Sequence, residues 1–181
     1  MSDTDSAGAT RAAGDTDDIT RMSANSFDQA RFREVLGHFA TGITVVTTRD
    51  DSGLTGFTCQ SFMSLSLDPP LVAFSPSKSS DTWPRMARVG TACINILSED
   101  HETIARTFAG KGEFKFDGVG YRHGLNGAPI LDGAVAWIEG AVHEVHDAGD
   151  HHLVVLSVSD VGTAGGEPIL FYRGGFGTFH S

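Results

Sequence analysis

The sequence has few cysteines, few basic residues and no long apolar run. Only Cys59 and Cys93 occur among 181 residues, each inside an apolar β-like stretch. No signal-peptide pattern opens the chain, so we expect reduced thiols in a cytoplasmic protein rather than a disulfide. The net charge of −10 argues against nucleic acid or an anionic membrane surface as a partner. No apolar stretch approaches the roughly 20 residues of a membrane helix.

Two common nucleotide-binding motifs are also missing. Gly110-Lys111-Gly112 and Gly118-Val119-Gly120 come close to G-x-G-x-x-G, but neither completes the pattern or leads into a helix. The P-loop pattern G-x-x-x-x-G-K-[ST] is absent as well. A dinucleotide that binds to this chain therefore does not bind on a Rossmann or P-loop frame.

The chain divides into a leader, residues 1–25, and one predicted domain, residues 26–181. The leader is rich in Ser, Thr, Asp, Ala and Gly, and this composition predicts a disordered acidic segment. Ser26 and Gln29 fit a capping box, which predicts a first helix that ends near Gly42.

The remainder is predicted to be mainly β. Two short helices are expected, one capped by Ser80 or Asp81 and stopped by Gly90, the other running from Ser98 to Gly110. Residues 111–132 are expected to be irregular. Strands are predicted at residues 43–48, 54–59, 71–74, 91–97, 134–146, 151–161 and 168–173. Hairpin links and irregularly placed helices favour an antiparallel barrel over a parallel βαβ sheet.

The most informative segment runs from Gly56 to Ser80. A β-like run leads into a hydroxyl- and amide-rich stretch, an Asp-Pro-Pro corner and a second apolar run. It ends in a cluster of four hydroxyls and one ammonium, contributed by Ser75, Ser77, Lys78, Ser79 and Ser80. With the free N–H groups of a following helix this cluster would form an anion site, and the alternative is an N-cap with a solvated lysine.

This segment resembles the flavin-binding core of the short-chain flavin reductases, which are the small partners of two-component flavin-dependent monooxygenases. The resemblance extends from about Phe32 to Tyr172. It implies a split Greek-key β-barrel with a few short helices that forms a homodimer, and it implies NAD(P)H-dependent reduction of diffusing FMN or FAD. The implied flavin contacts are Thr58, Cys59, Gln60, Ser61 and Phe62 along the ring, and Ser77, Lys78, Ser79, Ser80 and Lys111 at the phosphates.

Four histidines cluster near the last predicted hairpin. His143 and His146, like His151 and His152, would point to opposite faces of a strand, so we predict no metal site. Gly149-Asp150-His151 resembles a Gly-Asp-His motif of the same family. The resemblance implies that His151 binds or orients NADH, with Asp150 fixing the turn or the imidazole, and the alternative is a polar hairpin end.

Two other functions remain open from the sequence. A pyridoxamine-phosphate-oxidase type of enzyme shares the expected barrel but keeps its FMN bound and usually carries more arginine at the phosphate. A non-catalytic flavin- or haem-binding module is the third possibility. NADH is favoured over NADPH because no arginine cluster lies near His151 to meet a 2′-phosphate.

Overall fold

The computed structural model describes residues 28–112 and 114–179. The chain separates after His38 into two compact units, and each is described by itself. In the part of the first unit that the structure describes, one helix occurs, α2 (Gln29–Leu36). The N-cap of this helix is Asp28, whose carboxylate accepts a hydrogen bond from the backbone of Ala30 at 2.9 Å.

Two sequence predictions about this helix need correction. The predicted cap Ser26 lies outside the described residues, and the observed cap is Asp28. The helix also ends at Leu36 and not near Gly42, because Gly37 caps it and Gly42 already belongs to strand β1 (Thr41–Gly42).

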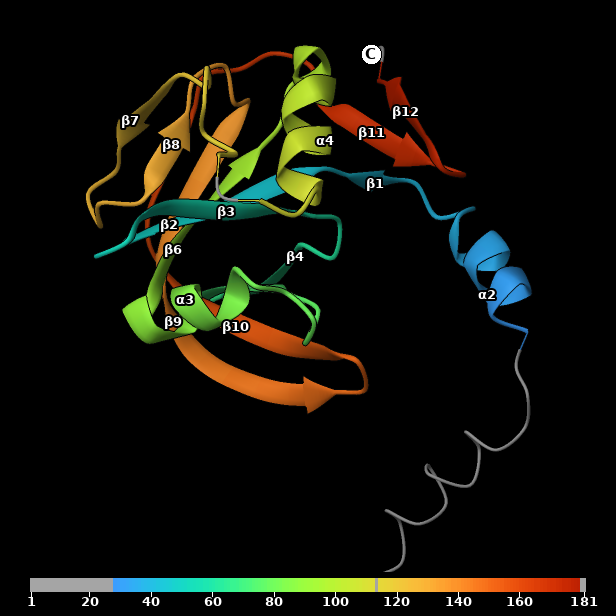
Figure 1. Cartoon of the computed structure of the whole chain (residues 1–181), viewed down its shortest axis with the longest axis horizontal. Helices are drawn as coiled ribbons and strands as arrows, with labels where there is room; N and C mark the ends of the chain where they lie inside the picture. Colours follow the sequence, from blue (N-terminus) through green and yellow to red (C-terminus); the bar gives the residue numbers. More distant parts are fainter. Residues whose placement is uncertain (1–27, 113, 180–181) are drawn as a thin grey trace, which may run out of the picture. The chain divides into compact units, whose positions relative to one another are not determined.

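The second unit is built around one seven-stranded antiparallel sheet (Figure 1). Its strands, in spatial order, are β3 (Gly53–Cys59), β2 (Thr44–Asp50), β6 (Thr91–Ile96), β9 (Ala136–Ala148), β10 (His151–Thr163), β5 (Pro70–Phe74) and β4 (Met63–Leu67). Although β3 and β4 are the two edge strands, only residues 60–62 separate them in the chain. The sheet must therefore curl until its edges approach each other, which gives a barrel.

Smaller elements complete this unit. A three-stranded sheet contains β1, β11 (Ile169–Tyr172) and β12 (Gly175–Thr178), and a hairpin contains β7 (Tyr121–His123) and β8 (Pro129–Leu131). The helices are α3 (Trp83–Val89), the 3-10 turn η1 (Glu99–His101) and α4 (Glu102–Ala109). The predicted main strands are confirmed, but β1, β4, β7, β8 and β12 were not predicted from the sequence.

Strand β2 separates two hydrophobic clusters, because both of its faces are buried. Val46 points into the first cluster, which is shared by the large strands and includes Trp83 and Met86 of α3. Val45 points into the second cluster, which α4 covers with Phe108. The alternation along one strand thus places α3 and α4 on opposite faces of the sheet.

Glycine ends the helix α3 as the sequence predicts. Gly90 adopts a left-handed conformation with φ of 75°, and its N–H donates to Met86. None of the helices in the described part of the chain is both long enough and apolar enough to span a bilayer.

Candidate active site

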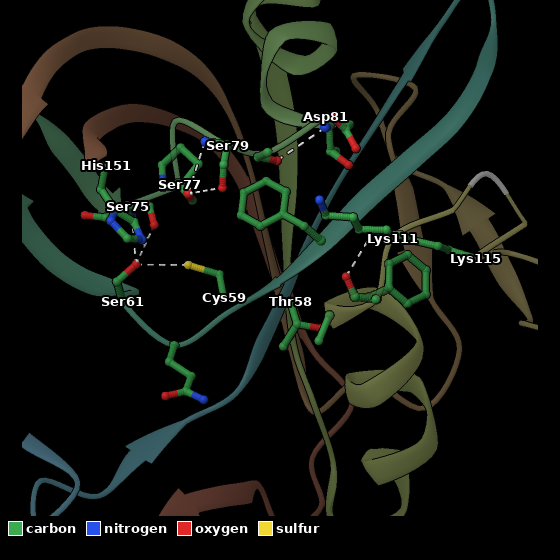
Figure 2. Close-up of a pocket in the computed structure, with 18 of the residues that line it drawn as sticks. Thr58, Cys59, Ser61, Ser75, Ser77, Ser79, Asp81, Lys111, Lys115 and His151 are labelled. Carbon is green, nitrogen blue, oxygen red and sulfur yellow. Dashed lines mark hydrogen bonds between the residues drawn. The ribbon is translucent and has the colours of Figure 1, made fainter. Parts of the chain in front are cut away.

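A pocket of about 500 Å³ opens between the barrel edge and the two helices (Figure 2). Its lining consists of residues 57–61 at the end of β3, residues 75–77 and 79–82 after β5, residues 108–109 at the end of α4, residues 110–112 and Lys115 after α4, and His151 at the start of β10. These segments are far apart in the sequence, so the pocket is a product of the fold.

Of the twelve residues proposed as site residues from the sequence, nine line this pocket. They are Thr58, Cys59, Gln60, Ser61, Ser77, Ser79, Ser80, Lys111 and His151. Phe62, Lys78 and Asp150 do not line it. Figure 2 shows His151 on one side of the pocket and Lys111 and Lys115 on the other.

Hydrogen bonds join the end of β3 to the neighbouring walls. The hydroxyl of Thr58 donates to the carbonyl of Ala105 in α4 at 2.6 Å. The hydroxyl of Ser61 accepts from the backbone N–H of Ser75 at 2.8 Å, and it lies 3.1 Å from the sulfur of Cys59. These contacts hold the β3 wall against the α4 wall and the loop after β5.

The loop after β5 runs antiparallel to the start of β10. Ser77 forms an isolated bridge with His151, the backbone N–H of Lys78 donates to Asp150 at 2.9 Å, and that of His152 donates to Pro76 at 3.0 Å. The serine cluster and the Gly-Asp-His turn, which are separate motifs in the sequence, therefore form one wall of the pocket.

Asp150 lies behind His151 and holds its imidazole. His151 Nδ1 and Asp150 Oδ1 are 2.8 Å apart, and an ionised carboxylate only accepts, so Nδ1 carries the proton. This hydrogen bond lowers the pKa of the Asp150 carboxyl below its ordinary value. The imidazole is thus oriented from outside the pocket, which leaves Nε2 for a ligand.

The predicted helix contribution to an anion site is wrong. The N-cap of α3 is Thr82, not Ser80 or Asp81. The hydroxyl of Ser80 accepts from the backbone N–H groups of Thr82 and Trp83, both at 3.2 Å, and the next residue, Pro84, has no N–H. The first backbone donors of α3 are therefore already used within the protein.

The other serine hydroxyls are also linked to one another. Ser77 and Ser79 hydroxyls lie 2.8 Å apart, and the N–H of Ser79 donates to the Ser77 hydroxyl at 3.2 Å. The ammonium of Lys78 pairs with Asp147 at 3.0 Å and lowers the pKa of that carboxyl. Lys78 therefore holds the loop to the long hairpin, and the lysines that line the pocket come from elsewhere.

Lys115 is a lining residue that the sequence analysis missed. Its ammonium donates to the carbonyls of Gly56 at 3.2 Å and Phe108 at 3.1 Å. Burial lowers the pKa of Lys115, and the charge of Asp81 acts in the opposite direction. A lone cation between Phe114 and Phe116 in a glycine-rich stretch was the signal that could have identified it.

The two adjacent histidines point to opposite faces, as predicted. The ring of His152 lies 6.0 Å from that of Trp83 at a tilt of 40°, and its Nδ1 lies 3.4 Å from Asp147, whereas His151 lines the pocket. His143 and His146 both approach Glu144, beside a β-bulge in the pairing of β9 with β10. Within residues 28–112 and 114–179, no group of three or more potential ligand side chains gathers to hold a metal.

The fold and the pocket together define a barrel protein with a polar, lysine-bearing ligand groove at the barrel edge. Residues 36–180 match the model of the flavin reductase like domain, so the chain belongs to this family. It is 45% identical over 167 residues to a flavin reductase from Pseudomonas putida, a match that covers 89% of this chain and 98% of the relative.

Two further proteins show the breadth of the similarity. The reductase subunit HsaB of a flavin-dependent monooxygenase from Rhodococcus jostii (strain RHA1) is 43% identical, over 84% of this chain and 79% of that one. A solved NADH:FAD oxidoreductase from Streptomyces globisporus superposes with a TM-score of 0.81 at 35% identity, over 87% of this chain and 96% of that one. The split-barrel fold expected from the resemblance is thereby confirmed.

Proposed function

We propose that this protein is an NADH-dependent flavin reductase that reduces FMN or FAD and supplies the free reduced flavin to a separate monooxygenase component. One observation supports this most. The segments that resemble a flavin-binding core meet His151 around one cavity of about 500 Å³, in a chain of the flavin reductase like family. Such a volume is within the range of small-molecule sites, roughly 300 to 1,000 Å³.

In this proposal the flavin ring lies along the end of β3. Cys59 is small and buried there, while Gln60 and Ser61 are exposed and line the pocket. The hydroxyl of Thr58 donates to Ala105, so Thr58 positions this wall, and its hydroxyl oxygen can accept a hydrogen bond from the ring but has no proton left to donate. A bound flavin supplies the electron-accepting chemistry, and the protein brings nicotinamide and flavin to reacting distance.

His151 is the proposed residue for the nicotinamide. Its Nδ1 is held by Asp150, so the remaining nitrogen can orient the carboxamide or pack beside the ring. No general base is needed, because the reaction moves a hydride between two cofactors.

The proposed phosphate contacts are the two lysines and the serine hydroxyls. Lys111 and Lys115 come from the stretch after α4, and Ser77 and Ser79 lie on the facing loop. Among the described lining residues of this pocket there is no arginine, which favours NADH over NADPH and disfavours the oxidase type with tightly held FMN.

The proposed homodimer would cover the edge strand β4. Met63, Leu65 and Leu67 are 45, 50 and 92% exposed, although edge strands are usually protected by charge. A second copy of the chain would bury this apolar edge. Light scattering should give the mass of a dimer, and a monomer mass would contradict the assignment.

The function is tested with extensively dialysed protein and NADH. We expect negligible NADH oxidation without flavin and fast oxidation after FMN or FAD is added, because several lining side chains are exposed and the flavin exchanges. Full activity without added flavin, with stoichiometric flavin retained through dialysis, would favour the bound-FMN oxidase. No NADH oxidation under any flavin condition would favour the non-catalytic module.

A further inference from the structure

A second cavity, of about 330 Å³, adjoins the first one. The two cavities share Asp81, Thr82, Gly112 and Lys115. Because these four residues line both, the second cavity continues the first along the boundary between the start of α3 and the stretch after α4. A ligand that fills the first cavity and is longer than it can extend into the second.

The walls of the second cavity combine apolar surface with two cations, Arg85 and Lys115, and one carboxylate, Asp81. Leu54 of β3 and Phe116 provide apolar contact, and Arg85 of α3 also lines the cavity. Phe116 is held edge-on against Phe108, with ring centres 4.9 Å apart and planes at 87°. Arg85 is held by two hydrogen bonds to Asp50, at 2.7 and 2.6 Å, and by one to the carbonyl of Gly53 at 3.2 Å. A flat heteroaromatic group that carries phosphate fits this combination.

Lys115 lies at the boundary of the two cavities. An ammonium has three N–H groups, and two of those on Lys115 donate to Gly56 and Phe108. One donor therefore remains at the point where a ligand would pass from one cavity into the other. An anionic linker, such as a pyrophosphate, is the group that this position would stabilise best.

We propose that the second cavity binds the adenylate half of FAD, with the pyrophosphate beside Lys115, so that FAD is bound in preference to FMN. This inference rests on the proposed function, because it assumes that the flavin ring occupies the first cavity. FMN is a flavin mononucleotide and lacks this half, so it leaves the second cavity empty.

The position of His151 assigns the second cavity to the adenylate of FAD and not to the adenylate of NADH. His151, the proposed nicotinamide residue, lines only the first cavity, and it lies across the pocket from Lys111 and Lys115 (Figure 2). The second cavity begins on the lysine side. It is therefore continuous with the part of the first cavity that is remote from the nicotinamide.

Equilibrium titrations with FMN and FAD test the inference, first on the unmodified protein and then on Leu54→Trp, which fills the second cavity. We expect the unmodified protein to bind FAD at least tenfold more tightly than FMN. Leu54→Trp should weaken FAD binding at least tenfold and change FMN binding less than threefold. Leu125→Trp is the matched control, since Leu125 is 87% exposed and lines neither cavity, and it should change neither affinity.

AMP provides a test that does not depend on a variant. AMP should bind together with FMN and should compete with FAD. Equal affinities for FMN and FAD, or competition of AMP with both, would overturn the subsite. A raised KM for NADH in Leu54→Trp with FMN as acceptor would assign the cavity to NADH instead. Reduction of FMN by NADH, measured in the same samples, separates failure of this subsite from failure of the proposed function.

Discussion

Replacing Asp50 by Asn should destabilise the fold by about 2 kcal/mol at neutral pH. Asp50 ends β2, and its carboxylate accepts two hydrogen bonds from Arg85 of α3 and one from the backbone of Ser52. The hydrogen bond from Arg85 is the largest cause that lowers the Asp50 pKa from 3.8 to about 2. This difference is equivalent to about 2 kcal/mol, and both side chains are at least three-quarters buried, so solvent screening is limited.

The sign of the pH dependence follows from the lowered pKa. A carboxyl with a lower pKa in the folded state adds stability above its ordinary pKa of 3.8, and this stability disappears as the pH falls toward 2. Urea unfolding at a series of pH values measures this contribution of Asp50 to the free energy of unfolding. The unmodified protein and Asp50→Asn should differ at pH 7 and converge near pH 2. The control is Asp51→Asn, an exposed turn residue, which should have little effect. A decrease in the free energy of unfolding below about 0.5 kcal/mol for Asp50→Asn, or an equal decrease for the control, would show that the pairing of Asp50 with Arg85 does not stabilise the fold as predicted.

Three further results are expected. Lys111→Ala should weaken FMN binding about tenfold and leave riboflavin binding unchanged, because it removes one charge-assisted phosphate contact. Lys78→Ala should change FMN binding less than threefold, because Lys78 pairs with Asp147. Titrations in which Lys78→Ala has the larger effect would assign Lys78 to the phosphate instead. Gly140→Ala should lower the free energy of unfolding, measured with urea, by about 2 to 3 kcal/mol, because a Cβ would lie 2.5 Å from the Ser157 carbonyl oxygen. Gly177→Ala should lower it far less, because a Cβ at Gly177 meets nothing within 4 Å. Deletion of residues 1–24 should leave the reductase rate and Tm essentially unchanged, and a large fall in either would show that the leader contributes to the fold or the site.

The fold was predictable where a β pattern extends over a run of several residues that is bounded by turn residues. The hairpin of β2 and β3 follows from two apolar runs separated by turn residues, and Gly90 predicted the end of α3. Strand β4 was missed although residues 63–67 alternate Met, Ser, Leu, Ser and Leu, because the serines were interpreted as part of a ligand-binding segment. The strands β7 and β8 have three residues each, too few for a periodic signal.

The site was predictable to the extent that each wall is a continuous segment. The β3 end and the serine cluster were recognised because their residues are neighbours in the sequence. The contact between Ser77 and His151 depends on the pairing of distant segments, which no local pattern reveals. Lys115 was missed, and the pairing of Lys78 with Asp147 was not predicted, for the same reason, since the partners Gly56 and Asp147 are distant in the chain.

The central claim is that NADH meets the flavin on the His151 side of the pocket. The most direct test compares His151→Ala with His152→Ala in steady-state kinetics, with NADH varied at saturating flavin. His151→Ala should raise the KM for NADH about tenfold or more, with flavin affinity nearly unchanged, and kcat should also fall if the contact is stronger in the transition state. His152→Ala should have a much smaller effect on the KM, because His152 packs against Trp83 on the opposite face. An unchanged KM for NADH in His151→Ala, or a larger change in His152→Ala, would contradict the account.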